Sequence, residues 1–255
     1  MTGAGERRGI AVRDKENEID EARASGGVDV GNRGRRRPGW RAAWVFGLVA
    51  LTLLAGCGAP EYTYVTNSTD RTYLRIPHSW QPIDERALDE AIGLDPTDTE
   101  QLNGFWLQGY DADTTPSADH LLGQHSAAPA VFIGVRDVPE LARGQISLDL
   151  LRDLFRPVSA SAREEAAMNP ASPFSGFALM TDEVLTPGDG LRGVHVVYRY
   201  RIGGGPSQVF DQIAYVNDDA SKLYMFYVRC SSDCYEQRKQ EIANVVSSFT
   251  VRETA

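Results

Sequence analysis

The three cysteines of this 255-residue chain carry its most reactive side chains, and one of them stands in a distinctive context. Cys57 directly follows Leu-Ala-Gly, at the end of the uncharged apolar run 42–54. Five arginines precede that run: Arg33, Arg35, Arg36, Arg37 and Arg41. A thiol is a nucleophile that can accept a transferred group. The run is shorter than the roughly 20 residues needed to cross a bilayer, which argues against a membrane-spanning helix.

This arrangement resembles the signal peptide of bacterial lipoproteins, in which a basic segment, an apolar segment and small residues precede a cysteine. The resemblance implies that the Cys57 thiol receives a diacylglyceryl group and that a peptidase cuts between Gly56 and Cys57. Two acyl chains would then hold the protein at the outer, extracytoplasmic face of the cell membrane. The arginine pair at 36–37 leaves twin-arginine export open beside the general route. Translation could start at Met1 or at a valine near residue 30.

The charge of the chain changes at the predicted cleavage site. Residues 1–56 hold 10 basic and 7 acidic side chains, whereas the remainder holds 16 basic and 28 acidic ones, a net charge of −12. An acidic domain repels phosphates, which argues against nucleic acid as a partner and against electrostatic adhesion to anionic lipid. We therefore expect membrane attachment through the N-terminal lipid. Arginine outnumbers lysine 23 to 3, a bias that fits a GC-rich, actinobacterial source.

Once Cys57 is assigned to lipid, Cys230 and Cys234 are the remaining cysteines. An even number of closely spaced cysteines in an exported protein favours a disulfide. The three residues between them differ from the two of thioredoxin-like redox sites, and nearby histidines that would complete a zinc site are missing from the sequence. We predict a structural bridge.

The division that we expect is an extension and signal peptide over 1–56, a lipidated tether over 57–66 and one extracytoplasmic domain over 67–255. The pattern of apolar residues predicts strands at 63–66, 105–109, 130–135, 194–202, 207–216 and 222–230, and residues 73–76 form a further apolar stretch. Capping residues predict helices that begin at Asp84, Ser147 and Asp233. The segments 94–102 and 111–128 are polar and predicted to be loops, and 157–175 is predicted to be a mobile surface loop.

The two ends of this domain resemble the PsbP-like family. Residues 73–80 read Tyr-Leu-Arg-Ile-Pro-His-Ser-Trp, and residues 223–235 and 242–251 resemble the last strand, helix and Ser-Phe-Thr-Val ending of the family. The resemblance implies an α+β fold, with an antiparallel β-sheet flanked by helices in an α/β/α sandwich. Members of the family are accessory or adaptor proteins and share no catalytic residues, so the resemblance implies a role of this kind. The middle of the chain is unmatched.

The residue types present allow two chemical alternatives, a metal site and a hydrolase. A metal site would draw on His120 and His125 with the upstream carboxylates Asp111, Asp113 and Asp119, yet no established ligand motif supports it. A hydrolase would need a nucleophile such as Ser175 with a base such as His195, yet the sequence lacks G-x-S-x-G. We expect a protein that is not an enzyme and that holds no cofactor and no metal.

Two hypotheses about function follow. The first is a non-catalytic cell-envelope lipoprotein that acts as an accessory or adaptor through an envelope protein partner. The alternative is a carrier that holds a small apolar or lipid ligand between sheet and helices, because aromatic residues are numerous enough to line a pocket as well as to fill a core. A hydrolase is the less favoured alternative.

Overall fold

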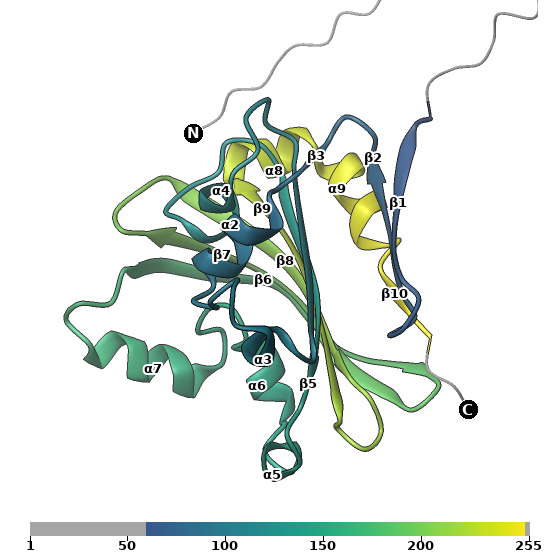
Figure 1. The fold of residues 1–255 in the computed structure, drawn as a ribbon. Helices are drawn as coiled ribbons and strands as arrows, with labels where there is room; N and C mark the ends of the chain where they lie inside the picture. Colours follow the sequence, from purple (N-terminus) through teal and green to yellow (C-terminus); the bar gives the residue numbers. More distant parts are fainter. Residues whose placement is uncertain (1–59, 253–255) are drawn as a thin grey trace, which may run out of the picture. The chain divides into compact units, whose positions relative to one another are not determined.

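The computed structural model describes residues 60–252, so Gly56, Cys57 and the rest of the predicted signal peptide lie outside the described residues. Within this range the strands form a seven-stranded sheet and a three-stranded sheet, with helices packed against the larger one (Figure 1). The predicted α+β class, with an antiparallel sheet flanked by helices, is confirmed. None of the helices in this range has the length and apolarity needed to span a membrane.

The seven-stranded sheet is antiparallel at every described strand pair. Its strands in spatial order are β3 (Gln81–Pro82), β4 (Phe105–Asp111), β5 (Ala130–Asp137), β9 (Lys222–Ser231), β8 (Ser207–Val216), β7 (Leu191–Ile202) and β6 (Phe174–Gly188). The chain turns from β7 into β8 at Gly203 and Gly204, whose φ angles of 58° and 76° suit residues without a Cβ. The predicted meander of the last three long strands is therefore confirmed.

One face of the large sheet, which we call the α9 face, is covered by the small sheet and the C-terminal helices (Figure 1). The small sheet has the order β1 (Tyr62–Asn67), β2 (Thr72–Pro77) and β10 (Thr250–Val251), and the helices are α8 (Ser232–Gln237) and α9 (Lys239–Val246). Trp80 is buried between these parts, and its indole Nε1 donates a hydrogen bond of 2.9 Å to Glu241 on α9. This bond ties the chain after β2 to α9.

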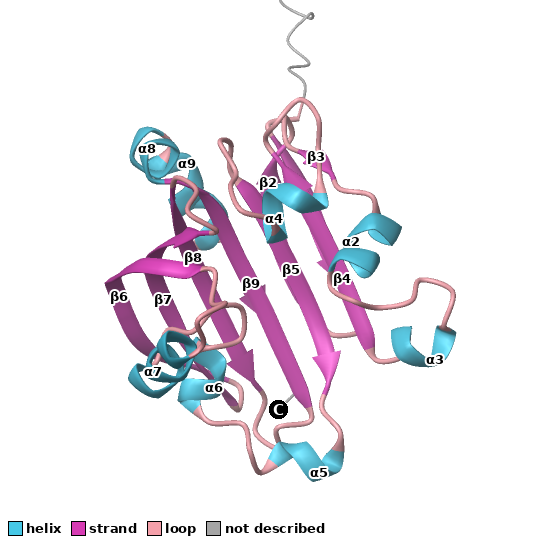
Figure 2. Ribbon diagram, turned by 90° about the vertical axis from the view of Figure 1, so that its left-hand side faces the viewer, coloured by secondary structure: helices cyan, strands magenta, loops and turns pink. Residues whose placement is uncertain are grey.

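The opposite face, which we call the α2 face, carries the short helices of the middle of the chain (Figure 2). They are α2 (Glu85–Ala91), α3 (Thr99–Leu102), α4 (Ala118–Leu122), α5 (Glu140–Arg143), α6 (Leu148–Arg152) and α7 (Ala160–Met168). Asp84 caps α2 and Ser147 caps α6, as predicted, because each side chain accepts a backbone N–H of the first turn. Leu88 and Leu121 are fully buried against the sheet.

The strand predicted at 63–66, within the segment expected to be the tether, is confirmed, since it lies in β1, which pairs with β2 along its whole length. Several sequence predictions for the irregular segments are wrong. The predicted loop segments 94–102 and 111–128 contain α3 and α4, which Asp98 and Ser117 cap. The predicted mobile loop 157–175 contains α7, because Ser159 caps a run of alanine, arginine and glutamate, which are good helix formers.

The predicted start of the C-terminal helix is also wrong by two residues. Ser231 caps α8, since its hydroxyl accepts the N–H of Cys234 at 3.3 Å, and Asp233 lies inside the first turn. The helix then breaks at Arg238 and resumes as α9. Cys230 and Cys234 form the predicted disulfide, with Cα atoms 5.9 Å apart, and it joins the end of β9 to the first turn of α8.

Candidate functional site

An apolar groove opens on the α2 face between α3 and α6, over β4, β5 and β9. Figure 2 shows these strands passing between the two helices. The groove has a volume of about 520 Å³ and is lined by Ile92, Leu94, Gln101, Phe105, Leu107, Phe132, Arg136, Leu154, Phe155 and Met225. Eight of these ten side chains are apolar. Its size lies within the range of about 300–1,000 Å³ that is typical of ligand pockets.

A glycine under the floor lets two of the lining side chains pack close to the sheet. In the sheet register Gly134 on β5 lies between Leu107 on β4 and Met225 on β9. A methyl group built on Gly134 would stand 2.6 Å from the Leu107 side chain and 3.3 Å from the ring of Phe132. Leu107 and Phe132 therefore lie directly over Gly134, and a larger residue there would push these two lining side chains into the groove.

The groove has two chemically different ends. Phe132 lies at one end, where its ring packs edge-on against Phe155 at 5.5 Å. Arg136 lies at the other end, four residues further along β5, with its guanidinium 4.7 Å above the ring of Phe105. Arg136 is exposed, and no carboxylate among residues 60–252 forms an ion pair with it. The groove thus combines an apolar floor with an unneutralised cation at its open rim.

A second exposed feature is the edge strand β6, the last strand of the large sheet. Three of its large apolar side chains are about half exposed: Leu179 at 48%, Met180 at 50% and Val184 at 55%. We call these residues the β6 patch. Register shifts interrupt the pairing of β6 with β7 on both sides of Leu179. Such irregular edges resist the addition of another strand, so a partner would bind the β6 patch through side chains.

The strands also bring together a histidine, a carboxylate and a phenol on the α9 face. Nε2 of His195 on β7 lies 2.8 Å from Oδ1 of Asp211 on β8, and the hydroxyl of Tyr235 on α8 donates to Oδ2 of Asp211 at 2.8 Å. The hydrogen bond to Asp211 raises the pKa of His195 above its ordinary value of 6.5, although burial lowers it. Burial, together with the nearby Asp211, raises the pKa of Tyr235. His195 is therefore a partly buried residue held by its carboxylate neighbour.

This cluster does not have the arrangement of a hydrolase. The second nitrogen of His195, Nδ1, lies 3.6 Å from Oε2 of Glu183, so both ring nitrogens face carboxylates. Such surroundings favour the imidazolium, which has no lone pair to accept a proton. Ser175 lies on β6 opposite Arg201, and no hydrogen bond in the described range joins it to His195. The two residues of the hydrolase alternative are thus not brought together.

The acidic loop of the metal alternative is organised around one carboxylate. Asp111 is fully buried; its Oδ2 lies 2.6 Å from Nδ1 of His120 and accepts the backbone N–H of Ser117, while its Oδ1 accepts that of Asp113. His125 is exposed and takes no part in these bonds. Within residues 60–252, no three histidine, cysteine or acidic side chains gather closely enough to hold a metal ion. Asp111 and His120 together shape the entry into α4.

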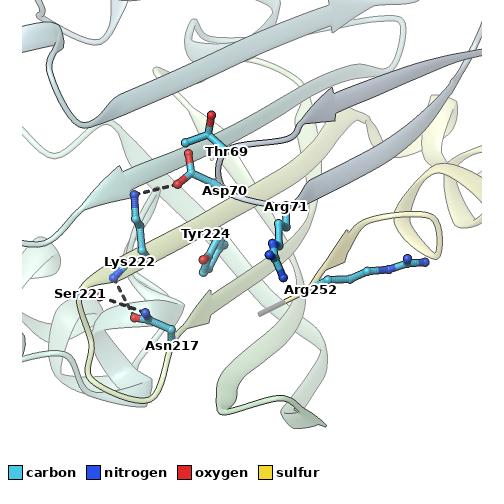
Figure 3. A pocket seen from close by; sticks show the side chains of 8 residues that line it. All are labelled: Thr69, Asp70, Arg71, Asn217, Ser221, Lys222, Tyr224 and Arg252. Atoms are coloured by element: carbon cyan, nitrogen blue, oxygen red, sulfur yellow. Dashed lines mark hydrogen bonds and ion pairs between the residues drawn. The ribbon is translucent and has the colours of Figure 1, made fainter. Parts of the chain in front are cut away.

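A polar pocket of about 370 Å³ lies beside the turn from β8 to β9 (Figure 3). Its lysine, Lys222, is held by Oδ1 of Asp70 at 2.7 Å and by Oδ1 of Asp137 at 2.5 Å. Burial disfavours the charged ammonium, but these two carboxylates outweigh it and raise the pKa of Lys222. The guanidinium of Arg252 stacks over the ring of Tyr73 at 5.5 Å, away from the lysine. The Lys222 ammonium group is therefore engaged in ion pairs that stabilise the fold.

Sequence reasoning missed one fully buried cation. The guanidinium of Arg229 on β9 donates to the carbonyls of Leu121 and Gly123 at 2.8 and 2.9 Å and to Gln208 at 3.1 Å. Burial lowers the pKa of Arg229 to about 10. Its carbonyl partners lie at the end of α4, so the charge stabilises the negative end of that helix. The sequence did hold one signal for this buried cation, because Arg229 is a charged residue within the long apolar strand β9.

Comparison with known proteins gives structural matches only, since no protein-family model and no curated protein sequence matches the chain. The cyanobacterial PsbP of Synechocystis is 19% identical over 77% of this chain and 96% of its own, with a TM-score of 0.43. LpqN, involved in cell envelope biogenesis of Mycobacterium tuberculosis, is 13% identical over 75% and 90%, with a TM-score of 0.38. The Ran-binding protein Mog1p of Saccharomyces cerevisiae is 7% identical over 76% and 97%, with a TM-score of 0.39. We draw the function from this chain's own residues.

Proposed function

We propose that this chain is a lipid-anchored, extracytoplasmic protein of the bacterial cell membrane that acts without catalysis, as an accessory or adaptor for an envelope protein. The basic segment, apolar run and Leu-Ala-Gly before Cys57 support the anchor. The disulfide between Cys230 and Cys234 fits an oxidising compartment. The acidic domain supports attachment through lipid rather than through charge.

The observation that carries the adaptor role is the β6 patch. Leu179 and Val184 lie opposite Tyr198 and Val194 of β7, so both point to the α2 face of the sheet. Exposed apolar side chains grouped on one strand mark interaction sites more often than isolated ones do. The charged Asp182 between them is held by Arg152 of α6, which leaves the apolar side chains free to meet a partner. The patch offers side-chain contacts on a rigid strand.

The surroundings of His195 support a role without catalysis. A general base needs a free nitrogen within reach of a proton, whereas both nitrogens of His195 face carboxylates. Asp211 in turn is shared with the Tyr235 hydroxyl, which lies in the core beneath α8. We interpret this cluster as a tie between the sheet and α8.

Site-specific photo-crosslinking in the source bacterium tests the adaptor role. A photoreactive residue replaces Val184 in the full-length chain, and a matched probe replaces Leu141 on α5, which is the most exposed large apolar residue of the described range. We expect a discrete adduct with an envelope protein from position 184, and none from position 141. Equal labelling from both positions, or none from 184, would contradict the proposal.

The alternative role, a carrier for an apolar ligand, is favoured by a different observation, the groove between α3 and α6. Six of its eight apolar side chains remain partly exposed in the folded chain, although burying them would be favourable by about 25 cal/mol per Å². Native mass spectrometry of protein purified from membranes would detect a bound lipid or other apolar molecule. Protein that is consistently free of such ligands would remove the carrier role and leave the adaptor role standing.

A further inference from the structure

The groove between α3 and α6 has two chemically different parts, because its floor is apolar and the exposed Arg136 lies at one end. From Phe132 to Arg136 the floor follows four residues of β5, a span of about 13 Å at the rise of a strand. Between these ends lie Leu107, Gly134 and Met225, none of which carries a charge. A ligand that fits must therefore present an apolar chain to the floor and a different group to the rim.

The positive charge of Arg136 at the rim indicates that the second group of the ligand is an anion. Arg136 is the arginine among the residues that line this groove. Arg136 has no ion-pair partner within residues 60–252, in a domain rich in carboxylates. Its planar guanidinium is held over Phe105 and suits a bidentate bond to a carboxylate. The polar side chain of Gln101 also lines the groove.

We infer that this groove binds a medium-chain fatty acid, with the acyl chain over Leu107 and Met225 and the carboxylate at the guanidinium of Arg136. The inference deepens the carrier role and rests on it, and it is independent of the β6 patch. A second copy of the chain or a helix of another protein would require a surface that extends beyond the groove. The single cation at one end fits a small ligand with one anionic group.

The test uses the mature, lipidated protein in nanodiscs and two photoactivatable probes of equal chain length, a dodecanoic acid and the corresponding dodecanol. Labelled peptides are mapped by mass spectrometry. We expect the acid to label peptides that contain Leu107, Leu154 or Met225. In Arg136→Glu this labelling falls about tenfold, because the guanidinium–carboxylate bond is replaced by repulsion. Leu154→Trp, which narrows the groove without touching Arg136, lowers the labelling by both probes.

Arg199→Glu is the matched control, since Arg199 is an exposed arginine on β7, away from the groove, and undergoes the same change of charge. Its labelling should equal that of the wild type. Equal labelling by acid and alcohol, unaffected by Arg136→Glu, would overturn the fatty-acid inference and leave the carrier role intact. Absence of groove labelling by either probe would overturn both. Labelling of a second protein copy across the groove would replace the ligand with a dimer interface.

Discussion

The change Asp211→Asn tests the contacts that join β7, β8 and α8. The Asp211 carboxylate is nearly buried and accepts from both His195 and Tyr235 at 2.8 Å. Asparagine keeps the shape but has one acceptor oxygen in place of two, so one of the two donors loses its partner. Hydrogen bonds to a charged group contribute about 1.5–3 kcal/mol each. We expect the free energy of unfolding to fall by about 2 kcal/mol near pH 6.

The loss should depend on pH in a defined direction. The pKa of His195 is raised in the folded protein, so its ion pair with Asp211 contributes in full below the ordinary value of 6.5. That contribution is lost as the pH rises through the raised pKa, where the imidazolium loses its proton. The difference between wild type and Asp211→Asn should therefore be larger near pH 6 than near pH 9.

Urea denaturation at the two pH values measures this difference, and an NMR titration of the His195 ring measures its pKa directly. Asp218→Asn, an exposed carboxylate in the turn after β8, is the control and should change stability by less than about 0.5 kcal/mol. The interpretation is wrong if the destabilisation is the same at both pH values. It is also wrong if the pKa of His195 is unchanged in Asp211→Asn.

Three further predictions concern the anchor, the bridge and a buried amide. Cys57→Ala should abolish incorporation of a fatty-acid analogue into the protein, and labelling equal to the wild type would contradict the lipid attachment. The double mutant Cys230→Ser/Cys234→Ser should stay folded with a loss of at most about 2 kcal/mol, the chain-entropy value for so short a loop; free thiols at both positions in unreduced protein would exclude the bridge. Gln212→Leu should cost about 1–3 kcal/mol in urea denaturation, because the buried amide accepts from Tyr198 and donates to the last carbonyls of α6. A stability equal to the wild type would contradict that assignment.

The elements with regular apolar alternation were predictable from the sequence. Residues 194–202, 207–216 and 222–230 lie within β7, β8 and β9, because each strand buries one or both faces and its pattern reports that burial. The helix starts at Asp84 and Ser147 were predictable because a side chain that accepts an N–H of the first turn is a local signal. Such signals depend on neighbours in sequence and need no tertiary contact.

The elements that were missed lack local signals of this kind. The pairing of β6 is broken by register shifts and most of its side chains are exposed, so its sequence shows no steady alternation. The helix α7 has no fully buried residue, and the surrounding serines and prolines suggested a loop. In both cases the structure follows backbone propensity and pairing with a neighbour, which apolar periodicity does not report.

The candidate site was less predictable than the fold. The floor of the groove brings Leu107 and Met225 to either side of β5, and that depends on the register of three strands far apart in sequence. The link of His195 to Tyr235 likewise needs α8 to lie over β8. The neighbours of His195 on β8 and α8 could not be read from the alternation of its own strand.

The measurement that tests the adaptor role most directly is an affinity titration of the partner recovered by cross-linking from position 184. Full-length protein in nanodiscs is compared with the double mutant Leu179→Asp/Val184→Asp, and Leu141→Asp serves as the exposed apolar control. Burying a carboxylate in place of an apolar contact should weaken binding by at least about tenfold, with the control unchanged. Equal affinity of all three proteins would contradict the account.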